Sequence, residues 1–104
     1  MAKFALVFHG GSMPESEEEG AKVMAAWGAW MEGLGSALTD PGNPFGDSTT
    51  INADGSTTAG GGANPASGYT LVDADSLDAA VALAKACPIL DGGGSVEVAE
   101  ALDM

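Results

Sequence analysis

The sequence holds one side chain that titrates near neutral pH without help from its surroundings, His9, which is the only histidine. It stands where the apolar run of residues 3–8 gives way to Gly10 and Gly11, and functional side chains often occur where a rigid element meets a loop. An imidazole suits general acid/base catalysis because its charge changes near neutrality. Two interpretations stay open, a catalytic histidine and a strand-end residue without chemistry.

A catalytic imidazole needs a neighbour that fixes its tautomer, and a carboxylate serves this purpose well. Asp40 is the first candidate, because it follows the predicted long helix and leads into a loop-rich segment; another carboxylate is the alternative. His9 and Asp40 are therefore predicted to form an acid/base pair that works without a cofactor. We expect no metal site, because one histidine, one cysteine and scattered carboxylates make no ligand pattern.

Four further residues are predicted to bind a ligand. Asn43 and Asn64 each precede a proline, which restricts their backbone and could hold their amides in place; turn-building is the alternative. Tyr69 could point its hydroxyl into the fold, or be a core tyrosine. Ser12, beside the glycine pair, could contact a ligand, but either it or Ser16 could instead cap the following helix.

The charge balance restricts the partners. The chain has 15 acidic residues, three lysines and no arginine, for a net charge of −12. Nucleic acid is excluded as a partner because phosphate contacts need Lys and Arg. A polyphosphate cofactor is not expected either, because no arginine can clamp it. The predicted ligand is a small neutral metabolite; a basic protein partner for the acidic surface is the alternative.

Hydrophobic periodicity predicts the elements that hold these residues. We expect a strand over residues 3–8, a helix of roughly 20 residues with an apolar stripe from Val23 to Leu38, a strand over 69–73, a helix over 77–87 and a strand over 95–100. Residues 39–67 are rich in Gly, Pro, Asn, Ser and Thr. Within them, Asp54-Gly55 predicts the turn of a β-hairpin between residues 48–52 and 56–60.

This order predicts an α+β fold: a ferredoxin-like βαββαβ domain over residues 1–104, with an antiparallel sheet and an inserted β-hairpin. Two helices cover only one face of such a sheet. The strand over residues 3–8 is apolar on both faces, so the other face needs a cover. A second copy is the simplest one, and we expect a homodimer.

The compartment is predicted from what the sequence lacks. No apolar run reaches the roughly 20 residues that span a bilayer, and the first residues do not resemble a signal peptide, so we expect no membrane association. A lone Cys87 fits a reducing, cytoplasmic location. We expect this cysteine to be a small buried hydrophobe rather than a nucleophile.

The C-terminal third resembles the YCII-related (DGPF-domain) family. Residues 68–98 contain a Gly-Tyr strand, an acidic turn before "LDAA", an alanine-rich helix ending in Cys-Pro, then a glycine run and a "VEV" strand. The first strand, the Trp-bearing helix and "GNP" also fit. The namesake Asp-Gly-Pro-Phe is absent, and Asp54-Gly55-Ser56-Thr57 stands roughly in its place.

The resemblance implies a dimeric α+β barrel, a His–Asp pair in a cleft, and relatives that isomerise, dehydrochlorinate or oxidise ring compounds, often without a cofactor. Three hypotheses stay open. The chain is a small cofactor-independent lyase or isomerase using His9 and Asp40, a non-catalytic small-molecule-binding or regulatory module, or a structural dimer without a pocket.

Overall fold

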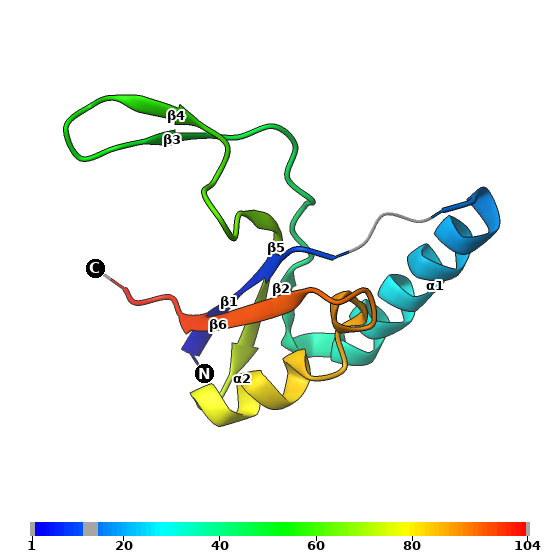
Figure 1. Cartoon of the computed structure of the whole chain (residues 1–104). Coiled ribbons are helices and arrows are strands. Elements are labelled where there is room, and N and C mark those ends of the chain that lie inside the picture. The colour runs from blue at the N-terminus through cyan, green and yellow to red at the C-terminus, as the bar shows by residue number, and fades with distance from the viewer. Residues whose placement is uncertain (1, 12–14, 104) are drawn as a thin grey trace.

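The structure, a computed structural model, describes residues 2–11 and 15–103. An antiparallel sheet in the order β2-β5-β1-β6 carries both helices on one face (Figure 1). The strands are β1 (Ala2–His9), β2 (Leu38–Asp40), β5 (Ala66–Ala74) and β6 (Ser95–Glu100), and the helices are α1 (Glu17–Leu34) and α2 (Leu77–Ala84). This is the predicted ferredoxin-like α+β fold.

Helix α1 begins as predicted but ends earlier. The Ser16 hydroxyl accepts a hydrogen bond from the backbone N–H of Glu19, and three glutamates fill the first turn, where they suit the helix dipole. Gly35 ends the helix with a φ of 55°, a conformation that glycine adopts without a side-chain penalty. The prediction that Leu38 belongs to the helical stripe was wrong, because this residue opens β2.

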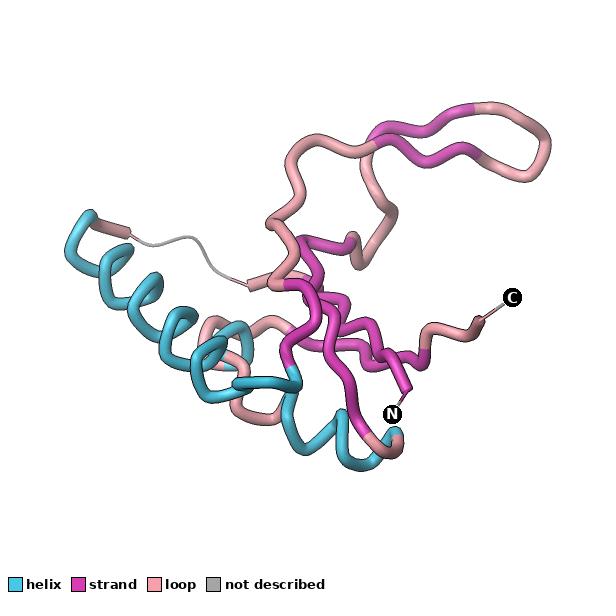
Figure 2. The backbone as a smooth tube through the Cα atoms, turned by 180° about the vertical axis from the view of Figure 1, so that it is seen from behind, coloured by secondary structure: helices cyan, strands magenta, loops and turns pink. Residues whose placement is uncertain are grey.

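The predicted hairpin is present and stands apart. Strands β3 (Thr49–Ile51) and β4 (Thr57–Ala59) form a separate two-stranded sheet around the Asp54-Gly55 turn. Gly55 takes a φ of 90° there. Figure 2 shows this hairpin on the side of the sheet opposite the helices. The strand that completes the main sheet is instead the short β2, which the sequence did not reveal.

Alternation along β1 divides the sheet into two faces. Phe4, Leu6 and Phe8 are buried toward the helices, where they form the core with Val72 of β5, Trp30 of α1 and Ala80 of α2. The intervening residues of β1 and β5 point the other way, and apart from the exposed Lys3 they are half-buried. We call that surface the helix-free face; its members are Ala5, Val7, His9, Tyr69 and Leu71.

The segment after α2 confirms the predicted role of Cys87. The Ser76 hydroxyl caps α2 by accepting from the backbone N–H of Ala79. The helix ends at Ala84, before the predicted residue 87, and Cys87 lies at the start of a short 3₁₀ turn as a free thiol with 2% exposure. Burial raises the pKa of this thiol to about 11.

None of the helices in residues 2–11 and 15–103 is long and apolar enough to cross a bilayer.

We predict that native Cys87 resists alkylation. At pH 8 the thiolate is the reactive form, and burial both suppresses it and blocks the reagent. Iodoacetamide should react about tenfold or more slowly with the native chain than with the urea-unfolded chain. The folded state holds the thiol proton of Cys87 more tightly than the unfolded state does. The stability that this protonated thiol contributes is therefore complete below pH 9 and is lost as the pH rises toward 11.

The matched control carries the thiol one residue earlier, at exposed Ala86, as Ala86→Cys in a Cys87→Ala background. The thiol at position 86 should react with iodoacetamide as fast as the thiol of the urea-unfolded chain. Equal rates for the native and unfolded wild-type chains would show that Cys87 is accessible.

Candidate functional site

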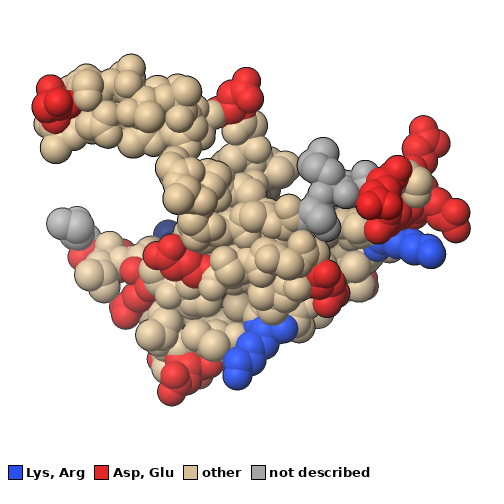
Figure 3. Space-filling view, in the orientation of Figure 1, with Lys and Arg blue, Asp and Glu red and all other residues tan. Residues whose placement is uncertain are grey.

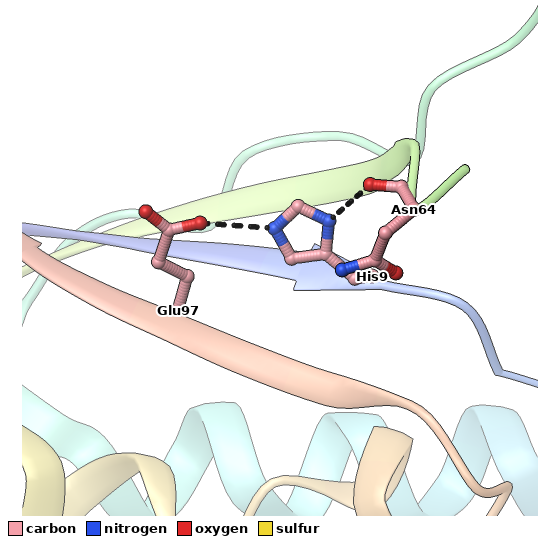
Figure 4. Close-up of polar contacts among 3 residues, drawn as sticks. All are labelled: His9, Asn64 and Glu97. Atoms are coloured by element: carbon pink, nitrogen blue, oxygen red, sulfur yellow. Dashed lines mark hydrogen bonds and ion pairs between the residues drawn. The ribbon is translucent and has the colours of Figure 1, made fainter. Parts of the chain in front are cut away.

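His9 ends β1 and is held on both sides of its ring (Figure 4). Its Nδ1 lies 3.0 Å from the backbone carbonyl oxygen of Asn64, and its Nε2 lies 3.2 Å from Oε1 of Glu97. The side chain of His9 is 13% exposed and that of Glu97 is 68% exposed. Figure 4 shows the ring above β1 and β6, away from the helices.

These contacts restrict the protonation of the ring. A carbonyl oxygen only accepts hydrogen bonds, so Nδ1 must carry a proton to bond Asn64. A carboxylate also only accepts, so Nε2 must carry a second proton when it pairs with Glu97. The imidazolium therefore satisfies both contacts. If Glu97 swings away, Nε2 is the atom free to exchange a proton.

The carboxylate beside His9 is that of Glu97 and not of Asp40. Asp40 pairs with Leu71 of β5, which in turn pairs with Ala5 of β1. Two strand spacings and four residues along β1 therefore separate Asp40 from His9, roughly 15 Å in all. The Asp40 carboxylate instead accepts from the backbone N–H of Gly42 at 2.8 Å. The expected His9–Asp40 contact was wrong.

An open hollow of about 750 Å³ lies at the roots of the hairpin and reaches Gly10 and Gly11, but His9 does not line it. It is lined largely by backbone, because many of its residues are glycines. They come from the turn after β1 and from both limbs of the hairpin: Gly10, Gly11, Phe45, Gly46, Asp47, Ser48, Ala59, Gly60, Gly61, Gly62, Pro65, Ala66 and Ser67.

A second cleft, of about 410 Å³, lies on the helix side of the sheet. Its walls are mostly apolar, with Trp27 packed edge-on against Phe8 at 5.1 Å between ring centroids. Among the residues that the structure describes, Tyr69 is its only ionisable member. The lining comes from β1, α1, the loop after β2, β5 and the 3₁₀ turn: Phe8, Val23, Met24, Trp27, Met31, Pro41, Gly42, Asn43, Pro44, Ser67, Gly68, Tyr69, Thr70 and Ile89.

The "GNP" loop forms one rim of this cleft, and backbone contacts hold it against β5. The carbonyl oxygen of Asn43 accepts from the N–H of Tyr69 at 3.3 Å, and Pro44 forms an isolated β-bridge with Gly68. A Cβ on Gly42 would collide with the carbonyl oxygen of Tyr69, and its φ of 71° also requires glycine. The loop is thus fixed by its glycine as well as by its proline.

The structure distributes the predicted ligand-binding residues over both faces. Asn43 and Tyr69 border the apolar cleft, whereas the backbone of Asn64 holds His9. The Tyr69 ring stacks on Phe45 at 5.8 Å between centroids. Ser12 lies outside the described residues.

Sequence reasoning missed Ser67, which lines both hollows. Its hydroxyl oxygen is buried and has no hydrogen-bond partner among the described residues. Buried polar atoms are nearly always bonded, so such an atom needs an explanation. Over the same residues, no three His, Cys, Asp or Glu side chains gather in a group that could hold a metal ion.

Comparison with known proteins identifies the family. A model of the YCII-related domain matches residues 5–104. The chain belongs to the YCII-related family. One similar solved structure is that of the 5-chloro-2-hydroxyhydroquinone dehydrochlorinase TftG from Burkholderia phenoliruptrix AC1100, in complex with 2,5-dihydroxybenzoquinone. The two share 18% identity with a TM-score of 0.53, over 94% of this chain and 93% of TftG. No curated protein matches the sequence.

At 18% identity, the likeness to TftG supports a shared fold and does not support a shared activity. It agrees with the ferredoxin-like topology observed for this YCII-related chain. The chemistry of the site must therefore be argued from its own residues.

We predict that Gly42→Ala destabilises this YCII-related protein, because the new Cβ displaces the loop from β5. The free energy of unfolding should fall by roughly 2 kcal/mol or more. Gly46→Ala is the matched control, because a Cβ there meets nothing within 4 Å; its effect should stay within about 1 kcal/mol. Urea denaturation measures both, and equal losses would contradict the close approach of Gly42 to Tyr69.

Proposed function

We propose that this protein binds a small, uncharged ring compound in the apolar cleft between α1 and the loop after β2. The observation that carries the proposal is a cleft of about 410 Å³ with aromatic walls and the exposed residue Asn43 on its rim. Small-molecule sites typically combine a mostly apolar concave surface with a few polar groups that orient the ligand.

The composition of the cleft supports an uncharged ligand. No Lys, Asp, Glu or His lines it, so an ion entering it would lose its hydration without gaining a counter-charge. The edges and faces of Trp27 and Phe8 suit a flat ring. The Asn43 side chain is the group that would bond a ring hydroxyl or carbonyl. The ring ligand named for TftG belongs to the same broad class of compound.

We predict that hydroquinone shifts the indole N–H resonance of Trp27 in a saturable manner in a ¹⁵N–¹H spectrum. A dissociation constant on the order of a millimolar is reasonable for a probe this small. The indole of Trp30 is an internal control, because its Nε1 donates to the carbonyl oxygen of Leu83 at 3.1 Å and the residue does not line the cleft. Asn43→Ala should weaken binding roughly fivefold.

Two controls sharpen this test. The probe 2,5-dihydroxybenzoate has the same ring with an added carboxylate, and it should bind roughly tenfold more weakly or not at all. Ser95→Ala, at an exposed position on β6, should leave hydroquinone binding unchanged. Equal shifts at Trp27 and Trp30, or no preference for the uncharged ring, would contradict binding in the cleft.

A second candidate is a cofactor-independent lyase or isomerase centred on His9. The supporting observation is that the Asn64 carbonyl holds Nδ1 while Nε2 meets a mostly exposed, displaceable carboxylate. A substrate bound beside His9 on the helix-free face would replace Glu97 and exchange a proton with Nε2. Glu97 then takes the role first assigned to Asp40.

We predict for this candidate that the chain releases chloride from 5-chloro-2-hydroxyhydroquinone, the compound in the name of TftG. His9→Gln should lower the rate by about 100-fold or more, because proton transfer contributes that much. Glu97→Gln should lower it less. Asp40→Asn is the matched carboxylate control and should have no effect. Chloride release that survives His9→Gln, or none from the wild type, would contradict acid/base catalysis of this reaction.

We further propose a homodimer that buries the helix-free face. Val7 and Leu71 lie at its centre in a half-buried state, and opposite charges meet at one end, where Lys3 pairs across the strands with Asp73. An apolar centre with balanced charge at the rim suits a two-fold interface, which must be complementary to itself.

A further inference from the structure

The β3–β4 hairpin and its flanks, residues 48–60, form an arm without a core. All six residues of β3 and β4 are exposed, and Ile51 is 74% exposed. A two-stranded hairpin alone is at best marginally stable in water. The arm also extends the molecule: the radius of gyration is 14.9 Å, against about 13 Å for a compact domain of this length.

The arm is nevertheless built to keep a definite shape. The Asn52 amide donates to the hydroxyl oxygens of Ser56 and Thr58, each at 3.1 Å. The Thr50 hydroxyl donates to the carbonyl oxygen of Gly60 at 2.6 Å. At the tip, hydrogen bonds from the hydroxyl and backbone N–H of Ser56 hold the pKa of Asp54 below its ordinary value. This polar lattice is typical of an ordered element rather than a flexible linker.

The direction of the arm points to what it contacts. It rises on the side of the sheet opposite the helices and overhangs the helix-free face (Figures 1 and 2). Figure 3 shows a recess between the arm and the body of the molecule. At the root of the arm, Phe45 stacks on Tyr69 of the helix-free face with 28° between the ring planes, so the arm starts from that face.

We infer that the arm clasps a second copy of this chain, seated on the helix-free face. The inference rests on the homodimer proposed above. Facing sheets pack about 10 Å apart, and the six residues of each limb of the arm reach about 20 Å at strand geometry. A second sheet on the helix-free face would therefore lie within reach of the arm, and two-fold symmetry would add a reciprocal arm.

Charge favours a second copy over a basic partner. Asp54 is the only charged residue among residues 48–60, in a chain with a net charge of −12. An acidic arm would be repelled by an acidic partner, whereas the Thr, Ser and Asn flanks of this arm are neutral. A basic protein would instead bind where acidic residues gather. The outer edges of β3 and β4 also leave backbone N–H and C=O groups available to another chain.

Photocrosslinking tests the clasp directly. A benzoylphenylalanine at position 51 should give a covalent dimer on a denaturing gel after irradiation at micromolar concentration. The same group at exposed Leu77, which starts α2 on the helix side, is the matched control and should give none. A variant with residues 49–59 replaced by two glycines should raise the dimer dissociation constant about tenfold or more by sedimentation.

The outcomes separate the arm from the dimer. An unchanged dissociation constant without a crosslink from position 51 would overturn the clasp and leave the homodimer standing. A wild-type chain that sediments as a monomer at micromolar concentration would overturn both. The far-UV circular dichroism spectrum of the arm-deleted variant shows whether the main sheet still folds. If that variant is unfolded, the crosslink from position 51 decides whether the arm contacts the second copy.

Discussion

The structure depends on a mismatch between one sheet and two helices. β1 lies between β5 and β6 and is apolar on both sides, but α1 and α2 cover only one of them. Burial of Phe4, Leu6 and Phe8 drives the helices onto that side. The other side keeps half-buried apolar residues and is the surface proposed for the second copy. The same alternation places the two candidate sites on opposite faces of the sheet, because Phe8 faces the apolar cleft and His9 faces away from it.

Periodicity predicted the elements that bury a regular face. β1, both helices and β6 have enough residues for a period of two or 3.6 to appear, and the Ser16 and Ser76 caps mark the helix starts. β2 has only three residues, too few to show any period. Leu38 also continued the spacing of the α1 stripe, although Gly35 already carried the helix-stop signal. Local patterns therefore failed where one strand pairing decided the structure.

The candidate site was predictable by residue type but not by neighbour. His9 stood out because of its titration range, whereas its carboxylate depended on strand order and register. A shift of one residue moves a side chain to the other face. Glu97 alternates with Val96 and Val98 along β6; placing β6 beside β1, as the ferredoxin-like order requires, would have found it. Ser67 gave no signal, because tertiary packing alone buries its hydroxyl.

The division of the sheet also limits how the two proposed functions can be combined. A ligand bound against Phe8 and Trp27 has the β-sheet between it and the imidazole of His9, and proton transfer requires hydrogen-bond reach, directly or through one water. His9 of the same chain therefore cannot act on a ligand in the apolar cleft. Within residues 2–11 and 15–103, Tyr69 is the one ionisable residue in the cleft lining, so binding there without acid/base assistance from His9 is the consistent interpretation. Catalysis by His9 requires a substrate on the opposite side of the sheet, within hydrogen-bond reach of Nε2.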